Sequence, residues 1–311
     1  METLVSEVEL LGKNNGPAAW VQYAAARGIL GGISRMPRGL KELYVSALAR
    51  LARSLDKRHS NAARAYMRQA LGCAAAEGLL GPDIEARVLT AWRHFLRLSI
   101  DAAAFDRKVG RDPIAHVEVE RCEGLDELIA SETGGLLVSP HLGDWEAGSA
   151  FLGHLGFDPL LAIVKPPRNR PLSRYLQRMR ASRRVTFLPR RGGIDLAAEG
   201  LKSGSWLLVL LDQRPRKGAV MAPFFGRPAR TERSAGVLAR RLRLPIVYFH
   251  CLKAEEPFRY RMRFTRIVTP EEVRSMSIEE LAALSNEEAE RAILGCPEQY
   301  FWLHDRFRQD P

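Results

Sequence analysis

Residues 135–148 read GLLVSPHLGDWEAG and combine a strand, a polar turn and the start of a helix. The run Gly135–Ser139 is typical of a buried strand, and residues 145–155 have the pattern of a helix. His141 stands between them, directly after the strand. In an open α/β sheet, ligands bind at the carboxyl ends of the strands. The stretch therefore predicts an α/β fold with a functional site at His141.

The same alternation continues through the rest of the chain. Short apolar runs at 160–164, 185–188, 206–211 and 246–252 predict buried strands, and helical patterns separate them at 171–182, 194–202 and 234–242. Residues 259–268 alternate charged and apolar side chains and predict a half-exposed strand, followed by a helix at 277–294. Alternating strands and helices favour an α/β fold with a central, largely parallel sheet flanked by helices.

The first 115 residues predict an N-terminal helical layer. Apolar residues recur at helical spacing over 40–55, 62–80 and 84–105. Residues 14–34 carry Arg27, Trp20 and Tyr23 but are too poor in Leu, Ile and Val for a transmembrane span. They form either an interfacial helix or a helix packed on the core. No Gly/Ser linker divides residues 1–115 from an α/β catalytic core at 116–311, so we expect a single domain.

The composition excludes several classes of protein. With 311 residues, 46% hydrophobic and 27% charged, the chain is neither disordered nor collagen-like. Its four cysteines form no CxxC pair, which favours a reducing compartment and disfavours a zinc ribbon. The histidines do not cluster at metal-ligand spacing, and no GxGxxG, P-loop or GxSxG motif is present. We therefore predict no metal and no cofactor.

Positive charge is concentrated in one segment. The formal net charge is +11, and residues 165–191 contain ten basic residues and no acidic one. Arginine predominates, which favours bidentate contacts with phosphate or carboxylate. The partner could be phosphate groups, an acidic membrane surface, an acidic protein or nucleic acid. Nucleic acid is disfavoured because Tyr175 and Phe187 are the only aromatic residues in the segment that could stack on bases.

The residues after His141 suggest general-base chemistry. Asp144 and Glu146 begin the next helix, three and five residues beyond the histidine, and a carboxylate there could hydrogen-bond one imidazole nitrogen and make the other more basic. Alternatively, these carboxylates only cap the helix. Ser139 could act as the nucleophile of a hydrolase with His141, but a spacing of two residues on one strand end is awkward for that pairing.

His141 and Glu146 form an H-x4-E pair, and further segments make the chain recognisable. "GLKSGSWLLVLLDQ" (200–213), "APFFGRPA" (222–229), "GVLARRLRLPIV" (236–247) and "PEQYFWLHDRFR" (297–308) follow in order. Together they resemble the late acyltransferases of lipid A biosynthesis. This lauroyl/myristoyl transferase family belongs to the H-x4-D/E lysophospholipid acyltransferase-like group.

The resemblance implies a reaction and its residues. A fatty acyl chain would pass from a thioester to a hydroxyl of a phosphorylated glycolipid, without a covalent enzyme intermediate. His141 matches the general base and Glu146 the carboxylate that orients it. Arg180 matches an arginine that binds phosphate or the oxyanion, and Asp212 matches the acidic residue of an Asp-Gln pair.

We expect a further set of residues to bind substrate. Arginines of the basic segment would meet phosphates, and the Phe-Phe-Gly turn would line an acyl groove. At position 144 the family often has Asn, so Asp144 is a departure from its pattern. The candidates are Asp144, Arg168, Arg170, Arg184, Gln213, Phe225, Gly226 and Arg227.

The resemblance also implies partners and a location. The donor would be acyl carrier protein or acyl-CoA, and the acceptor an anionic glycolipid at a membrane surface. The expected location is the cytoplasmic face of the bacterial inner membrane, with peripheral or weak anchoring. A phosphatidylinositol mannoside or another glycolipid acceptor, acylated from acyl-CoA, is the alternative, and no residue separates the two.

Overall fold

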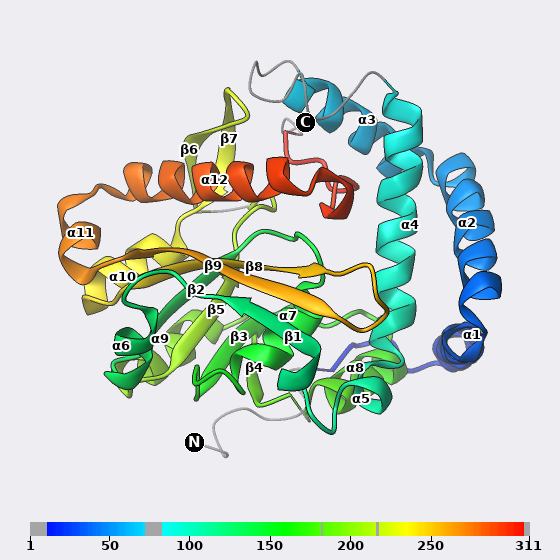
Figure 1. Ribbon diagram of the computed structural model, residues 1–311, viewed down its shortest axis with the longest axis horizontal. Helices are drawn as coiled ribbons and strands as arrows, with labels where there is room; N and C mark the ends of the chain where they lie inside the picture. The colour runs from blue at the N-terminus through cyan, green and yellow to red at the C-terminus, as the bar shows by residue number, and fades with distance from the viewer. Residues whose placement is uncertain (1–10, 72–82, 182, 216–217, 308–311) are drawn as a thin grey trace.

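The computed structural model describes residues 11–71, 83–181, 183–215 and 218–307. Figure 1 shows a central sheet with helices on both sides and a group of helices from the N-terminal part at one end. Within the described residues the main sheet has seven strands in the order β1-β9-β8-β2-β5-β3-β4. The expected fold class, an α/β protein with a largely parallel central sheet, is confirmed.

The parallel part of the sheet consists of β2 (Gly135–Ser139), β3 (Leu160–Val164), β4 (Val185–Pro189), β5 (Trp206–Leu210) and β8 (Ile246–Lys253). These five strands are the apolar runs that the sequence indicates, with ends shifted by at most one residue. β9 (Tyr260–Val268) is antiparallel to β8, and β1 (Val117–Glu120) is parallel to β9. The carboxyl ends of the parallel strands meet at one edge, and the site lies there.

Helices cover both faces of this sheet. One apolar cluster joins α7 (Trp145–Leu152) to the face that carries Leu137 and Ala162. A second cluster joins α9 (Gly193–Lys202) and α10 (Ser234–Leu242) to the opposite face. The other helices of this part are α6 (Leu125–Ala130), α8 (Arg170–Ala181), α11 (Pro270–Ser275) and α12 (Ile278–Gly295).

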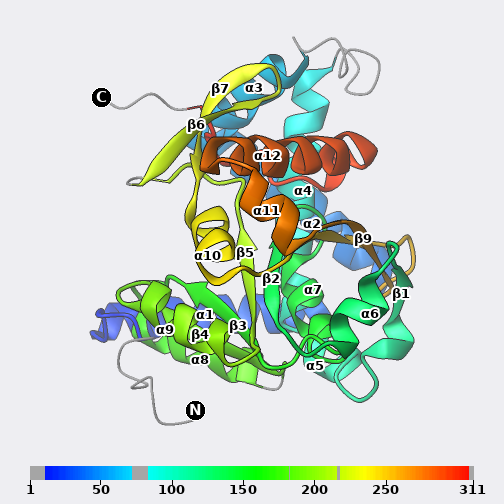
Figure 2. The same cartoon turned by 90° about the vertical axis from the view of Figure 1, so that its left-hand side faces the viewer.

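The N-terminal helices form a layer beside the sheet. They are α1 (Pro17–Arg35), α2 (Arg38–Leu55), α3 (Lys57–Leu71), α4 (Ile84–Ala102) and the short α5 (Phe105–Lys108). The helix expected at 62–80 thus begins earlier, and its end falls outside the described residues. Figure 1 shows α4 between the sheet and the outer helix α2, and in Figure 2 both helices lie behind the sheet. No described helix is long and apolar enough to cross a membrane.

A third apolar cluster joins this layer to the C-terminal segment. Tyr66 on α3 packs edge-on against Trp302, with ring centroids 4.9 Å apart, and its hydroxyl lies 2.9 Å from that of Tyr300. A two-stranded ribbon, β6 (Ala219–Phe224) and β7 (Arg227–Glu232), enters the same cluster through Phe224. The segment after α12 is therefore fixed against the helices that begin the chain.

Candidate active site

His141 lies in a tight loop between β2 and α7. Gly143 in this loop has φ +66°, and a Cβ there would lie 2.0 Å from the carbonyl oxygen of Cys251, so only glycine fits. Gly143 also donates its N–H to the Gln299 carbonyl at 3.0 Å, and the Phe301 N–H donates to the His141 carbonyl at 3.0 Å. The loop is thus held between β8 and the C-terminal segment.

Asp212 binds His141 twice. Its Oδ1 lies 2.6 Å from His141 Nδ1, and its Oδ2 accepts the His141 backbone N–H at 2.9 Å. Burial alone would raise the pKa of this carboxyl, but the ring and the backbone N–H of His141 outweigh burial, so the pKa is lowered. The buried group is a carboxylate, and we assign the imidazole proton to Nδ1. Nε2 then carries a lone pair, as a general base requires.

Neighbouring residues fix the other side of the ring. The Gln213 amide nitrogen lies 3.2 Å from His141 Nε2, and an amide N–H donates to such a lone pair. The rings of Trp145 and Phe301 pack next to the imidazole, with centroids 5.0 and 6.2 Å from it and 5.9 Å from each other. The structure thus places Asp212 and Gln213, two of the expected site residues, in contact with His141.

The carboxylates after His141 have other partners. Asp144 caps α7 by accepting the Ala147 N–H at 3.0 Å and is buried, which raises its pKa. Glu146 lies 3.3 Å from the buried guanidinium of Arg183 and lines the groove described below. The expectation that Glu146 orients the imidazole is corrected. Asp212, which follows β5 next to β2, makes that hydrogen bond.

Ser139 does not fit the alternative of a serine hydrolase. Its side chain is buried, and its hydroxyl donates to the Pro140 carbonyl at 3.1 Å. The hydroxyl is therefore directed to the backbone and away from the role of a nucleophile activated by His141.

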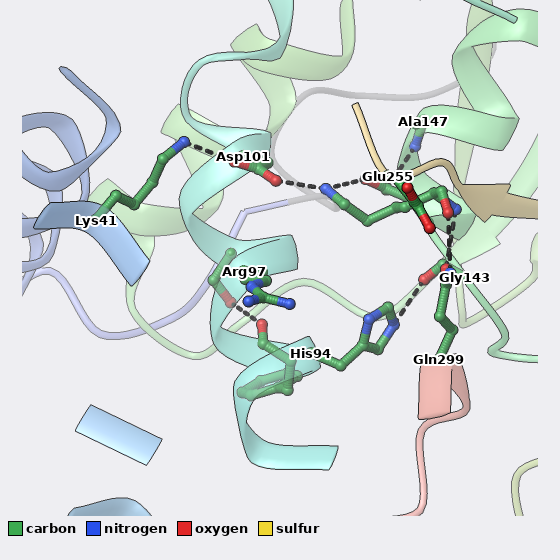
Figure 3. A network of polar contacts seen from close by, with 12 residues as sticks. Lys41, His94, Arg97, Asp101, Gly143, Ala147, Glu255 and Gln299 are labelled. Atoms are coloured by element: carbon green, nitrogen blue, oxygen red, sulfur yellow. Dashed lines mark hydrogen bonds and ion pairs between the residues drawn. The ribbon is translucent and has the colours of Figure 1, made fainter. Parts of the chain in front are cut away.

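A polar network anchors the His141 loop to the helical layer (Figure 3). His94 on α4 contacts the Gly143 carbonyl through Nε2 at 3.0 Å, and burial lowers its pKa to about 3, so the ring is neutral and donates. The Lys253 ammonium pairs with Asp101 on α4 and lies 4.0 Å from Asp144. The Gln299 amide accepts the Lys253 N–H and donates to the Lys253 carbonyl, both at 2.9 Å.

His141 opens onto a groove of about 790 Å³. Its floor is formed by the carboxyl halves of β3 and β5, where Ile163, Val164, Leu208, Val209 and Leu210 are only half-buried. These apolar residues would be covered in an ordinary sheet, so a long apolar ligand fits there. Its polar lining residues are His141, Glu146, Ser149, Lys165, Arg190, Gln213, Glu232, Arg233, Ser234 and Arg241.

Most of the expected substrate-binding residues lie elsewhere. Phe225 and Gly226 form the turn of the β6–β7 ribbon. Phe225 is buried, and its ring centroid lies 4.9 Å from that of Phe224. The expectation that they line an acyl groove is corrected: Phe225 packs in the aromatic cluster, Gly226 is exposed, and neither lines the groove. Arg180 lies on α8, and its side chain falls outside the described residues. The side chains of four further candidates are not among those lining the groove: Arg168, Arg170, Arg184 and Arg227.

The cations that do line the groove were not singled out from the sequence. Lys165 and Arg190 directly follow β3 and β4, whereas Arg233 precedes α10 and Arg241 lies in its last turn. Lys165 and Arg190 belong to the basic segment, and the rule that sites gather at the carboxyl ends of strands could have selected them.

Comparison of the sequence with known protein families identifies the family of this chain. The family model for the bacterial lipid A biosynthesis acyltransferase matches residues 13–309. The chain belongs to this family. Its model spans both the N-terminal helices and the sheet, so the resemblance seen in the four sequence blocks is confirmed and extends to the helical layer.

Curated relatives of this family member include proteins of Escherichia coli and Shigella flexneri. The chain is 29% identical over 195 residues to the lipid A biosynthesis palmitoleoyltransferase of Escherichia coli, covering 61% of each protein. A lipid A biosynthesis acyltransferase of Shigella flexneri gives the same values. The lauroyltransferase of E. coli is 28% identical over 210 residues, which covers 66% of this chain and 65% of the relative. The match thus spans less than two thirds of each relative.

Proposed function

We propose that this protein transfers a fatty acyl chain from a thioester to a hydroxyl of a phosphorylated glycolipid, as in lipid A biosynthesis. The observation that carries the proposal is the 2.6 Å contact between His141 Nδ1 and the buried Asp212 carboxylate, at the mouth of an apolar groove. With the ring proton on Nδ1, Nε2 is unprotonated. A substrate hydroxyl can bind Nε2 in place of the Gln213 amide, which contacts it in the structure. Membership of the family and the apolar floor support the same reaction.

The reaction needs one base and no protein nucleophile. His141 Nε2 takes the proton of the acceptor hydroxyl while its oxygen attacks the thioester carbonyl. The tetrahedral intermediate then collapses, the carbon–sulfur bond breaks, and the leaving thiolate takes the proton back from the imidazolium. The Asp212 carboxylate stabilises the imidazolium between these steps. We keep Arg180 as the group proposed to stabilise the oxyanion.

We propose acyl carrier protein as the donor. Such a carrier is acidic, and the surface beside the groove presents exposed Lys165, Arg168, Arg174 and Arg178. Turnover with the same acyl chain on carrier protein and on coenzyme A tests this choice. Comparable kcat/KM values for both donors would contradict it, and acceptance of a mannosylated lipid would favour the alternative acceptor.

The base is tested by His141→Ala. We expect kcat to fall about 10²–10⁴-fold while the fold is retained. His154→Ala is the matched control, because His154 is an exposed histidine that does not line the groove. Product formation is measured by mass spectrometry of the acylated acceptor. Wild-type turnover in His141→Ala would remove the proposed mechanism.

We also propose that the protein binds the cytoplasmic face of the inner membrane through α1 and α2. These helices carry exposed large apolar side chains beside basic ones, a combination that suits an anionic lipid surface. The exposed residues are Trp20, Val21, Ile29, Leu40, Leu43, Tyr44, Leu51 and Leu55.

Sedimentation with phosphatidylglycerol vesicles tests this surface. We expect the double change Leu43→Ser and Leu51→Ser to release the protein from the vesicles. Met221→Ser is the control, because Met221 is equally exposed but lies on the β6–β7 ribbon. Equal loss of binding in both variants would contradict a specific lipid-binding face.

A further inference from the structure

Two cations stand side by side at the sheet edge that carries His141. β3 and β4 are paired in parallel, with Val164 opposite Pro189. Lys165 and Arg190 are the residues that directly follow these two strands, and neighbouring strands lie about 4.8 Å apart. Both side chains are exposed, and both line the groove. Like charges placed next to each other on neighbouring strands repel, so their position is unfavourable unless an anion binds between them.

Carboxylates of the groove do not neutralise this pair. Glu146 is engaged by Arg183 at 3.3 Å, and Glu232 accepts the backbone N–H groups of Arg233 and Ser234, each at 3.0 Å. In the parts of the chain that the structure describes, neither Lys165 nor Arg190 forms an ion pair with an acidic side chain. Their charge is therefore directed at the groove and at solvent.

The cation pair lies at a defined place relative to the base. β5 separates β2 from β3, so the strand that precedes His141 is two strand spacings from the strand that precedes Lys165. That is about 10 Å, and β4 with Arg190 is about 5 Å further. The half-buried apolar floor of β3 and β5 lies between them. Along the sheet edge the order is base, apolar floor and cation pair.

We propose that Lys165 and Arg190 bind a phosphate ester of one of the two substrates while its reacting group lies at His141. Arginine offers paired N–H donors to phosphate oxygens, and the lysine ammonium adds a point charge. This assignment rests on the proposed acyl transfer. It adds a phosphate site formed by two residues that are not among the arginines expected to bind substrate, namely Arg168, Arg170, Arg184 and Arg227. The phosphate belongs either to the glycolipid acceptor or to the phosphopantetheine arm of the donor.

Direct binding tests the cation pair without turnover. Isothermal titration calorimetry uses two phosphorylated probes, N-acetylglucosamine 1-phosphate and pantetheine 4′-phosphate, each compared with its unphosphorylated form. We expect Lys165→Ala and Arg190→Ala to weaken binding of one phosphorylated probe about tenfold or more, since a charge-assisted hydrogen bond is lost. Arg191→Ala is the matched control, because Arg191 is the adjacent, equally exposed arginine and does not line the groove.

Steady-state kinetics identifies the source of the phosphate. If the acceptor supplies it, Arg190→Ala raises the acceptor KM about tenfold and leaves the donor KM unchanged; if the donor supplies it, the pattern is reversed. Equal effects of Arg190→Ala and Arg191→Ala, or equal affinity for phosphorylated and unphosphorylated probes, would overturn the proposal. The probes bind without turnover, so the calorimetry does not depend on His141. Wild-type turnover in His141→Ala would refute the proposed base and leave the phosphate site untouched.

Discussion

Replacing Asp212 with asparagine tests the base more sharply than removing His141. The two Asp212 oxygens both accept: Oδ1 from Nδ1–H at 2.6 Å and Oδ2 from the His141 backbone N–H at 2.9 Å. Asparagine has one oxygen and one NH₂ group, so one of the two contacts would place donor against donor. The backbone N–H cannot give up its proton, whereas the imidazole can.

We therefore expect Asp212→Asn to reverse the tautomer of His141. The amide NH₂ would donate to Nδ1, the ring proton would move to Nε2, and the lone pair that accepts the substrate proton would be lost. Removing a general base costs typically 10²–10⁴-fold, and the equivalent change in a Ser-His-Asp hydrolase costs about 10⁴-fold. We expect kcat to fall about 10³-fold, with a loss of stability of about 2 kcal/mol for the charge-assisted hydrogen bond.

Two measurements on Asp212→Asn check this. Turnover is followed by mass spectrometry of the acylated product, and ¹⁵N NMR of the imidazole reports which ring nitrogen carries the proton. Asp305→Asn is the control, because Asp305 is a half-buried aspartate with no hydrogen bond to His141 among the described residues. Wild-type kcat in Asp212→Asn, or a proton that stays on Nδ1, would refute the reasoning.

Three further changes probe the support of the His141 loop. Gly143→Ala would place its Cβ 2.0 Å from a backbone oxygen, so we expect a loss of about 3 kcal/mol and a lower urea midpoint; an unchanged midpoint would contradict the fit. His94 has a folded pKa of about 3, so the unfolded chain alone binds a proton there as pH falls below 6.5. The wild type should lose about 2 kcal/mol more than His94→Gln between pH 7 and 5, measured by urea unfolding at both pH values. Lys253→Met leaves Asp101 and Asp144 without their shared ammonium and should cost about 3 kcal/mol, restored in part by adding Asp101→Asn; no recovery would argue against the pairing.

The sequence predicts the parallel strands well because each is a short, largely apolar run between helical patterns. It does not indicate the β6–β7 ribbon, since Pro223 and Pro228 interrupt any strand pattern and the charged residues of β7 hide it. β1 (Val117–Glu120) is too short, with an alternating VEVE pattern, to be recognised. These elements depend on contacts with distant segments and have weak local signals.

The partner of His141 could not be found by spacing alone. Asp144 and Glu146 are close in sequence, but the helix they begin uses Asp144 as its cap, and Arg183 engages Glu146. Asp212 is 71 residues away and reaches the ring because β5 lies next to β2. Strand order is a property of the whole sheet. The resemblance to the family identified Asp212 as a site residue, and only the structure shows what it contacts.

The loop that seats the imidazole has a consequence for synthesis of the enzyme. Its supports come from α4, from the end of β8 and from Gln299 and Phe301, so they are spread over most of the chain. A nascent polypeptide still missing the segment after α12 has all the strands but lacks two of the hydrogen bonds that hold the base. The His141 loop therefore gains its last two hydrogen bonds only once Gln299 and Phe301 have been added to the chain.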